Sequence, residues 1–72
     1  MNEKNIEAQI QEIFKNFNNK NYEIVIDECL NLIRLNYKIP IIYNLLGTVF
    51  NFKKEYEKSL EYYLQGVKLE PG

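Results

Sequence analysis

The amino-acid sequence predicts an all-α fold in which four helices form two successive antiparallel pairs. Three observations carry this prediction. Apolar residues recur at steps of three and four along nearly the whole chain, no stretch alternates with a period of two, and the second half of the chain repeats the first. Steps of three and four place side chains on one face of a helix, whereas a half-buried strand needs a period of two.

The first half of the chain is expected to hold two helices separated by the polar stretch 18–21. The apolar residues of the first helix are Ile6, Ile10, Ile13, Phe14 and Phe17. The second begins at Tyr22 and fades at residues 36–38, because Pro40 disfavours helical conformation in the residue before it.

The second half predicts another two helices. Pro40 suits the first turn of the third helix, where its missing N–H costs nothing, and this helix continues through Leu46 and Phe50 toward residues 53–54. The fourth helix runs from Tyr56 to Leu69.

An internal repeat links the two halves. The second helix falls on the fourth at a shift of 34 residues, with Tyr22 on Tyr56, Glu23 on Glu57, Val25 on Ser59, Ile26 on Leu60, Cys29 on Tyr63, Leu30 on Leu64, Leu32 on Gly66 and Ile33 on Val67. The first helix falls on the third at a shift of 33, which places Phe14 on Gly47 and predicts a first inter-helix turn one residue shorter than the second. Such a period, with two helices per unit, is typical of a helical solenoid.

Residues 40–71 resemble a tetratricopeptide repeat in residue type and spacing together. The matching residues are Tyr43, Leu46, Gly47, Phe50, Ser59, Tyr63, Gly66 and Pro71. The resemblance implies one domain, residues 1–72, forming a short right-handed solenoid with repeats at about 6–38 and 39–72. We expect Gly47 and Ser59 to lie where two helices cross closely, and Gly66 to leave room for the first helix of a following repeat. In the first repeat the bulkier Phe14, Val25 and Leu32 predict a wider crossing.

Composition excludes several classes of function. Nine basic and ten acidic residues are interspersed, so the clustered cations that nucleic acid requires are missing. No apolar run resembles a signal peptide or a membrane span, and a soluble cytoplasmic protein is expected. With one cysteine and no histidine, we expect no metal site, no cofactor and no catalytic residues. Cys29 lies on an apolar helix face and is expected to be a buried, inert thiol.

The resemblance implies that the first helix of each repeat lines a concave groove that receives a peptide or a partner helix. The stripe expected there consists of Gln11, Lys15, Asn18, Asn44, Thr48 and Asn51. Amides on one face can hydrogen-bond a peptide backbone, and Lys15 would favour a carboxylate. The alternative is that these residues are only the solvated faces of two amphipathic helices.

The last helix raises a second expectation. An apolar edge formed by Leu60, Tyr63, Leu64 and Val67 has no further helix in the chain to cover it. Further repeats of a longer parent chain, an isologous homodimer, or a modestly apolar edge tolerated in water would each account for it.

The sequence therefore predicts a protein–protein interaction module, an adaptor or scaffold that binds a peptide or partner helix in the groove. The alternatives are a module that self-associates through its C-terminal edge, and an N-terminal targeting domain of a larger enzyme.

Overall fold

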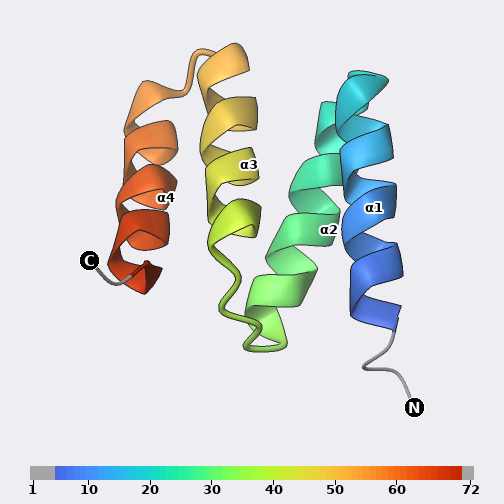
Figure 1. Cartoon of the computed structure of the whole chain (residues 1–72). Helices are drawn as coiled ribbons and strands as arrows, with labels where there is room; N and C mark the ends of the chain where they lie inside the picture. Colours follow the sequence, from blue (N-terminus) through green and yellow to red (C-terminus); the bar gives the residue numbers. More distant parts are fainter. Residues whose placement is uncertain (1–4, 71–72) are drawn as a thin grey trace.

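Four α-helices make up the computed structural model, which describes residues 5–70 (Figure 1). The helices are α1 (Asn5–Asn18), α2 (Tyr22–Arg34), α3 (Pro40–Phe52) and α4 (Tyr56–Leu69). No strand occurs among residues 5–70. The predicted all-α fold with its two helix pairs is confirmed, whereas Pro71 lies outside the described residues.

The helices stand in a row in chain order, as Figure 1 shows. The backbone of each helix approaches only that of its neighbours in the chain, so α2 lies between α1 and α3, and α3 lies between α2 and α4. The molecule is thin, with extents of 37 × 32 × 19 Å. One face of α1 and one face of α4 are therefore left at the two ends of the row.

The turns between paired helices have the same backbone structure. Lys20 and Lys54 both adopt left-handed conformations, with φ of 64° and 65°. The N–H of Asn21 donates to the carbonyl oxygen of Asn16, and the N–H of Glu55 donates to that of Phe50, each at 2.9 Å. Every residue in this comparison is 34 positions from its equivalent.

This equivalence corrects the prediction for the first helix. Both turns contain three residues, 19–21 and 53–55, so the first turn is not shorter. Because a helix advances by about 100° per residue, α1 is rotated by that angle relative to the expectation from the shift of 33. Ile13, and not Phe14, takes the place of Gly47, and Phe14 is 37% exposed.

The core is a continuous cluster between the four helices. Its most deeply buried side chains, at most 2% exposed, are Ile13, Val25, Cys29, Leu32, Ile42, Leu46 and Val49. Cys29 is buried, as its position on the apolar face of the second helix predicted.

The helices α3 and α4 pack most closely. A Cβ atom built on Gly47 would lie 2.7 Å from the ring of Tyr63, so this ring rests directly on the backbone of α3. The buried Ser59 hydroxyl donates to the carbonyl oxygen of Gly47 at 2.7 Å. Gly47 and Ser59 thus mark the crossing, as predicted. Gly66 is also buried, but it faces Tyr43 of its own helix pair, so its small size serves the crossing of α3 and α4 and not the packing of a following helix.

The crossing of α1 and α2 is wider. Ile13 and Val25 stand where the second pair has Gly47 and Ser59, and the two backbones approach each other at fewer positions. A hollow of about 60 Å³ remains between them, lined by Gln9, Ile13, Glu28, Asn31 and Leu32. The wider crossing follows the prediction, although Ile13 contributes the bulk assigned to Phe14.

Candidate functional site

The stripe predicted on the third helix is partly engaged with α4. Asn44 and Thr48 are half-buried and Asn51 is exposed. The Thr48 hydroxyl donates to the carbonyl oxygen of Asn44 at 2.9 Å. It also lies 2.8 Å from the Tyr63 hydroxyl, which therefore donates to Thr48 because the single proton of Thr48 is already used.

The amide of Asn44 lies against α4. A Cβ atom built on Gly66 would come within 3.1 Å of Asn44 Oδ1. Asn44 therefore supports the packing of the second helix pair as well as lining the predicted stripe.

The structure does not join this stripe to the one predicted on the first helix. Gln11, Lys15 and Asn18 are all exposed. At the spacing of 34 set by the turns, they take the positions of Leu45, Val49 and Phe52. Leu45 and Val49 lie in the buried core, and Phe52 contacts Tyr22 of α2. The α1 residues equivalent to Asn44, Thr48 and Asn51 are Ile10, Phe14 and Phe17.

Sequence reasoning missed this arrangement because it matched apolar residues with apolar residues. The spacing between the polar turns was the available signal, since Lys20 and Lys54 are 34 residues apart, like Tyr22 and Tyr56.

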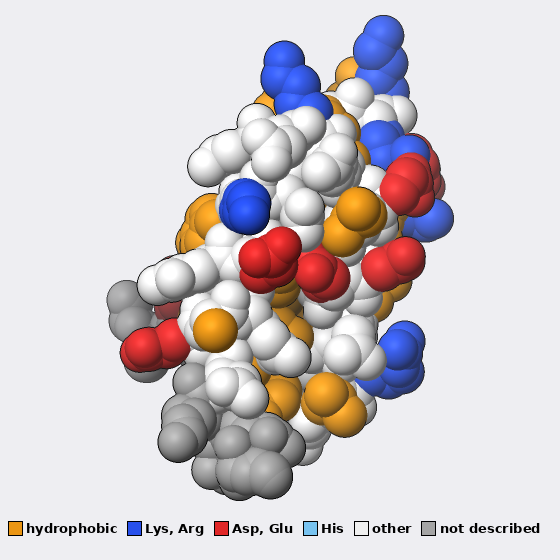
Figure 2. All heavy atoms as spheres, turned by 90° about the vertical axis from the view of Figure 1, so that its right-hand side faces the viewer, with side chains coloured by type: hydrophobic (Ala, Val, Ile, Leu, Met, Phe, Trp, Pro, Cys, Tyr) orange, Lys and Arg blue, Asp and Glu red, His pale blue; other side chains and the backbone are white. Residues whose placement is uncertain are grey.

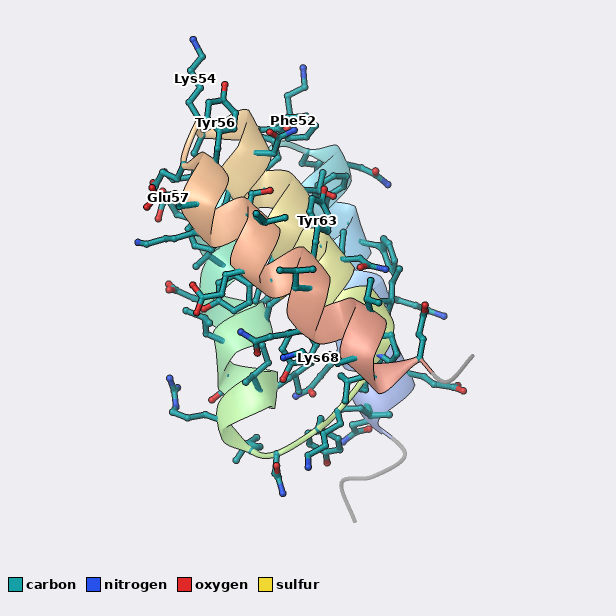
Figure 3. All side chains as sticks on the ribbon, turned by 90° about the vertical axis from the view of Figure 1, so that its left-hand side faces the viewer. Phe52, Lys54, Tyr56, Glu57, Tyr63 and Lys68 are labelled. Carbon is teal, nitrogen blue, oxygen red and sulfur yellow. The ribbon has the colours of Figure 1, made fainter. Side chains whose placement is uncertain are left out.

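The outer face of α4 carries a row of exposed apolar side chains. The exposed fractions are 60% for Tyr56, 59% for Leu60, 52% for Leu64 and 63% for Val67. In Figure 3 this helix lies in front, and no other described element covers it. We call these four residues the α4 face. Leu60, Leu64 and Val67 belong to the predicted edge, and Tyr56 is added to it by the structure.

Tyr63, the fourth residue of the predicted edge, differs from the other three. Its ring is half-buried against Gly47 and its hydroxyl meets Thr48. Tyr63 therefore connects the α4 face to the stripe on α3, so the two predicted surfaces adjoin.

The chemistry of the described residues is limited. Burial, with a smaller contribution from the Glu28 carboxylate, raises the pKa of Cys29 to about 12, which keeps this thiol protonated at neutral pH. Within residues 5–70, no group of histidine, cysteine, aspartate and glutamate side chains is arranged to hold a metal ion. None of the described helices has the length and apolar character needed to cross a bilayer.

The fold defines a small all-α domain built from two equivalent helix–turn–helix units with an exposed apolar face on the last helix. No protein-family model, curated protein or solved structure gives a significant match to the chain.

Proposed function

We propose that this chain is a protein–protein interaction module with two tetratricopeptide-like repeats in a short right-handed solenoid, and that it has no catalytic activity of its own. The exposed α4 face is the observation that carries the proposal. Four large apolar side chains in a row on one helix are unusual on the surface of a monomeric protein and mark sites of association. Burying such a side chain contributes about 1.5–3 kcal/mol.

The protein acts in the cytoplasm, and its partner is another polypeptide. Acidic and basic residues are nearly balanced, so neither nucleic acid nor a membrane surface is favoured as a ligand. The aliphatic and aromatic α4 face suits the apolar side chains of another protein.

Affinity capture with the full chain tests this function. The double variant Leu60→Lys with Leu64→Lys should lose the captured polypeptide, because two charges would be buried without counter-ions on binding. Leu35→Lys is the matched control, since Leu35 is also exposed but lies in the loop after α2. Equal recovery by all three proteins would contradict the proposal for the α4 face.

The stripe on α3 offers a second surface beside Tyr63. Asn44→Ala with Asn51→Ala should abolish capture if a peptide backbone is bound there by amides. Gln11→Ala with Asn18→Ala serves as the control, because those residues point to a different side of the molecule. Circular dichroism must show that the Asn44 variant stays folded, since Asn44 packs on α4. Unchanged recovery in the folded double variant would rule the stripe out.

Self-association is the alternative use of the α4 face. A twofold axis would bury the same four residues on two copies. Sedimentation velocity over a range of concentrations tests it, and a strict monomer at high concentration eliminates the dimer. The other alternative is that the chain is an N-terminal targeting domain of a larger enzyme. The sequence of the parent open reading frame tests it, since an enzyme domain would be encoded downstream.

A further inference from the structure

The α4 face repeats a surface that is already occupied elsewhere in the molecule. At the spacing of 34, the residues of α2 that correspond to Tyr56, Leu60, Leu64 and Val67 are Tyr22, Ile26, Leu30 and Ile33. On α2 these side chains are covered: Ile26 is only 8% exposed, and the other three are half-buried against the core. The covering element on this side of α2 is α3.

The side of α3 that packs against α2 is apolar. Ile42, Leu45 and Val49 share the side of α3 that faces away from α4, and all three are buried. The side of α3 toward α4 is occupied instead by Tyr43, Gly47 and Phe50.

The end of α3 adds an aromatic contact and an ion pair. The ring of Phe52 lies 5.5 Å from that of Tyr22, centroid to centroid. The next residue, Lys53, pairs with Glu23 of α2. The two α2 residues in these contacts, Tyr22 and Glu23, recur on α4 as Tyr56 and Glu57, which are exposed and stand together at the start of the helix (Figure 3).

We propose that the α4 face binds an amphipathic helix with the chemistry of α3. Such a helix carries apolar residues at successive steps of three, four and three, like Ile42, Leu45, Val49 and Phe52, with an aromatic residue at the last position and a lysine directly after it. The aromatic residue meets Tyr56 and the lysine meets Glu57. This inference rests on the proposed function and names its ligand.

A second copy of the chain does not supply this helix. The α3 face of the copy is already buried against its own α2. At the other end of the row, the α1 residues equivalent to Ile42, Leu45, Val49 and Phe52 are Ala8, Gln11, Lys15 and Asn18, all of them exposed. Figure 2 shows this end of the molecule, where polar and charged atoms separate the apolar side chains. Copies therefore have no complementary surface for stacking head to tail.

The helix spacing allows a direct test in which the full chain is extended. A copy of residues 39–72 is added directly after Gly72. The copied α3 then begins 18 residues after the start of α4, which is the distance from the start of α2 to the start of α3. In the matched control, the copies of Ile42, Leu45 and Val49 are replaced by alanine, glutamine and lysine, the residues that α1 has at these positions. The loop, the length and the second copied helix are the same in both proteins.

The extended chain should melt at least about 5 °C above the control extension. The backbone amides of Leu60, Leu64 and Val67 should gain protection from hydrogen exchange, relative to the 72-residue chain, only in the extension that carries the unchanged copy of α3. Leu60→Lys with Leu64→Lys should cancel the gain, while leaving the melting temperature of the 72-residue chain within about 2 °C of its original value.

Equal melting temperatures for the two extensions, with α4 amides unprotected in both, would overturn the inference. So would a 72-residue chain that already dimerises through the α4 face and whose dimer the added helix fails to displace. Failure of the proposed function is seen in a different experiment, the affinity capture: the Leu60→Lys with Leu64→Lys variant would then capture the same polypeptide as the wild type.

Discussion

Gly47 lies at the closest contact between the two helices of the second pair, where a side chain has less room than at Gly66. Its Cα lies under the ring of Tyr63, and Tyr63 in turn donates to Thr48. A methyl group at this position must displace the ring that carries this hydrogen bond.

We predict that Gly47→Ala destabilises the protein by about 1–2 kcal/mol. Overpacking costs about 1–3 kcal/mol, and the better helix propensity of alanine offsets up to about 1 kcal/mol of it. Urea denaturation measures the change. In the background of Tyr63→Ala the same substitution should be neutral or stabilising, because the ring is gone. An equal loss in both backgrounds would show that the ring does not cause it.

Cys29 makes stability depend on pH in the alkaline range. The pKa of this thiol rises to about 12 in the folded protein, whereas the thiol in the unfolded chain keeps a pKa near the ordinary value of 9.0. Below the unfolded pKa both states hold the proton and the thiol leaves stability unchanged with pH. Above it the unfolded state ionises first, so the free energy of unfolding falls as pH rises toward 12.

The fall attributable to Cys29 should approach about 1.4 kcal/mol per pH unit between the two pKa values. The Cys29→Ala variant isolates it, because lysines and tyrosines titrate alike in both proteins. Denaturation at several pH values above 9 should bring the stability of the wild type closer to that of the variant. A difference that stays constant with pH would mean that the thiol is not buried as the structure shows.

At the scale of the helix, α2 and α4 have nearly the same apolar pattern and opposite environments. Ile26 is buried beneath α3, whereas its equivalent Leu60 is exposed. The difference arises from the order of the helices in the row, since α2 has a neighbour on both sides and α4 has one.

Alanine substitutions should separate these two environments. Ile26→Ala is expected to cost about 2–4 kcal/mol, through lost burial and the cavity left behind. Leu60→Ala should change the free energy of unfolding by less than about 0.5 kcal/mol. Thermal or urea denaturation of the 72-residue chain at low concentration measures both. A large loss for Leu60→Ala that grows with protein concentration would instead indicate that α4 is covered by another copy.

At the scale of the whole molecule, the two helix pairs differ in packing. Gln9 and Asn16 of α1 stand where α3 has Tyr43 and Phe50. Between α1 and α2, the Asn16 amide donates a 3.3 Å hydrogen bond to the Glu28 carboxylate in place of an aromatic contact. The hollow between α1 and α2 adds to this difference. A domain of this size has a net stability of only about 3–5 kcal/mol, so local differences matter.

We therefore expect α1 to open before the rest of the protein. Its amides should exchange with solvent at least about tenfold faster than those of α3, because local opening exposes little apolar surface. Native-state hydrogen exchange followed by NMR measures this residue by residue. Uniform protection across all four helices would show that the molecule opens as a single unit.

Much of the fold could be predicted from the chain alone. The steps of three and four located all four helices, Pro40 marked the start of α3, and the pair of Gly47 and Ser59 marked the closest crossing. The pattern also indicated that Leu60, Leu64 and Val67 share an apolar face of α4, and no other described helix covers these three side chains.

The tertiary structure decided between the two possible orientations of α1, at shifts of 33 and 34, and it showed which way Gly66 faces. An apolar pattern shows that a helix has a buried face, but it does not identify the neighbour that buries it. The rotation of α1 is set by the backbone hydrogen bonds of the turn at residues 19–21, which match those at residues 53–55 whatever the side chains on the helix. That rotation turns Gln11, Lys15 and Asn18 to the free end of the row, so the molecule has one polar end and one apolar end.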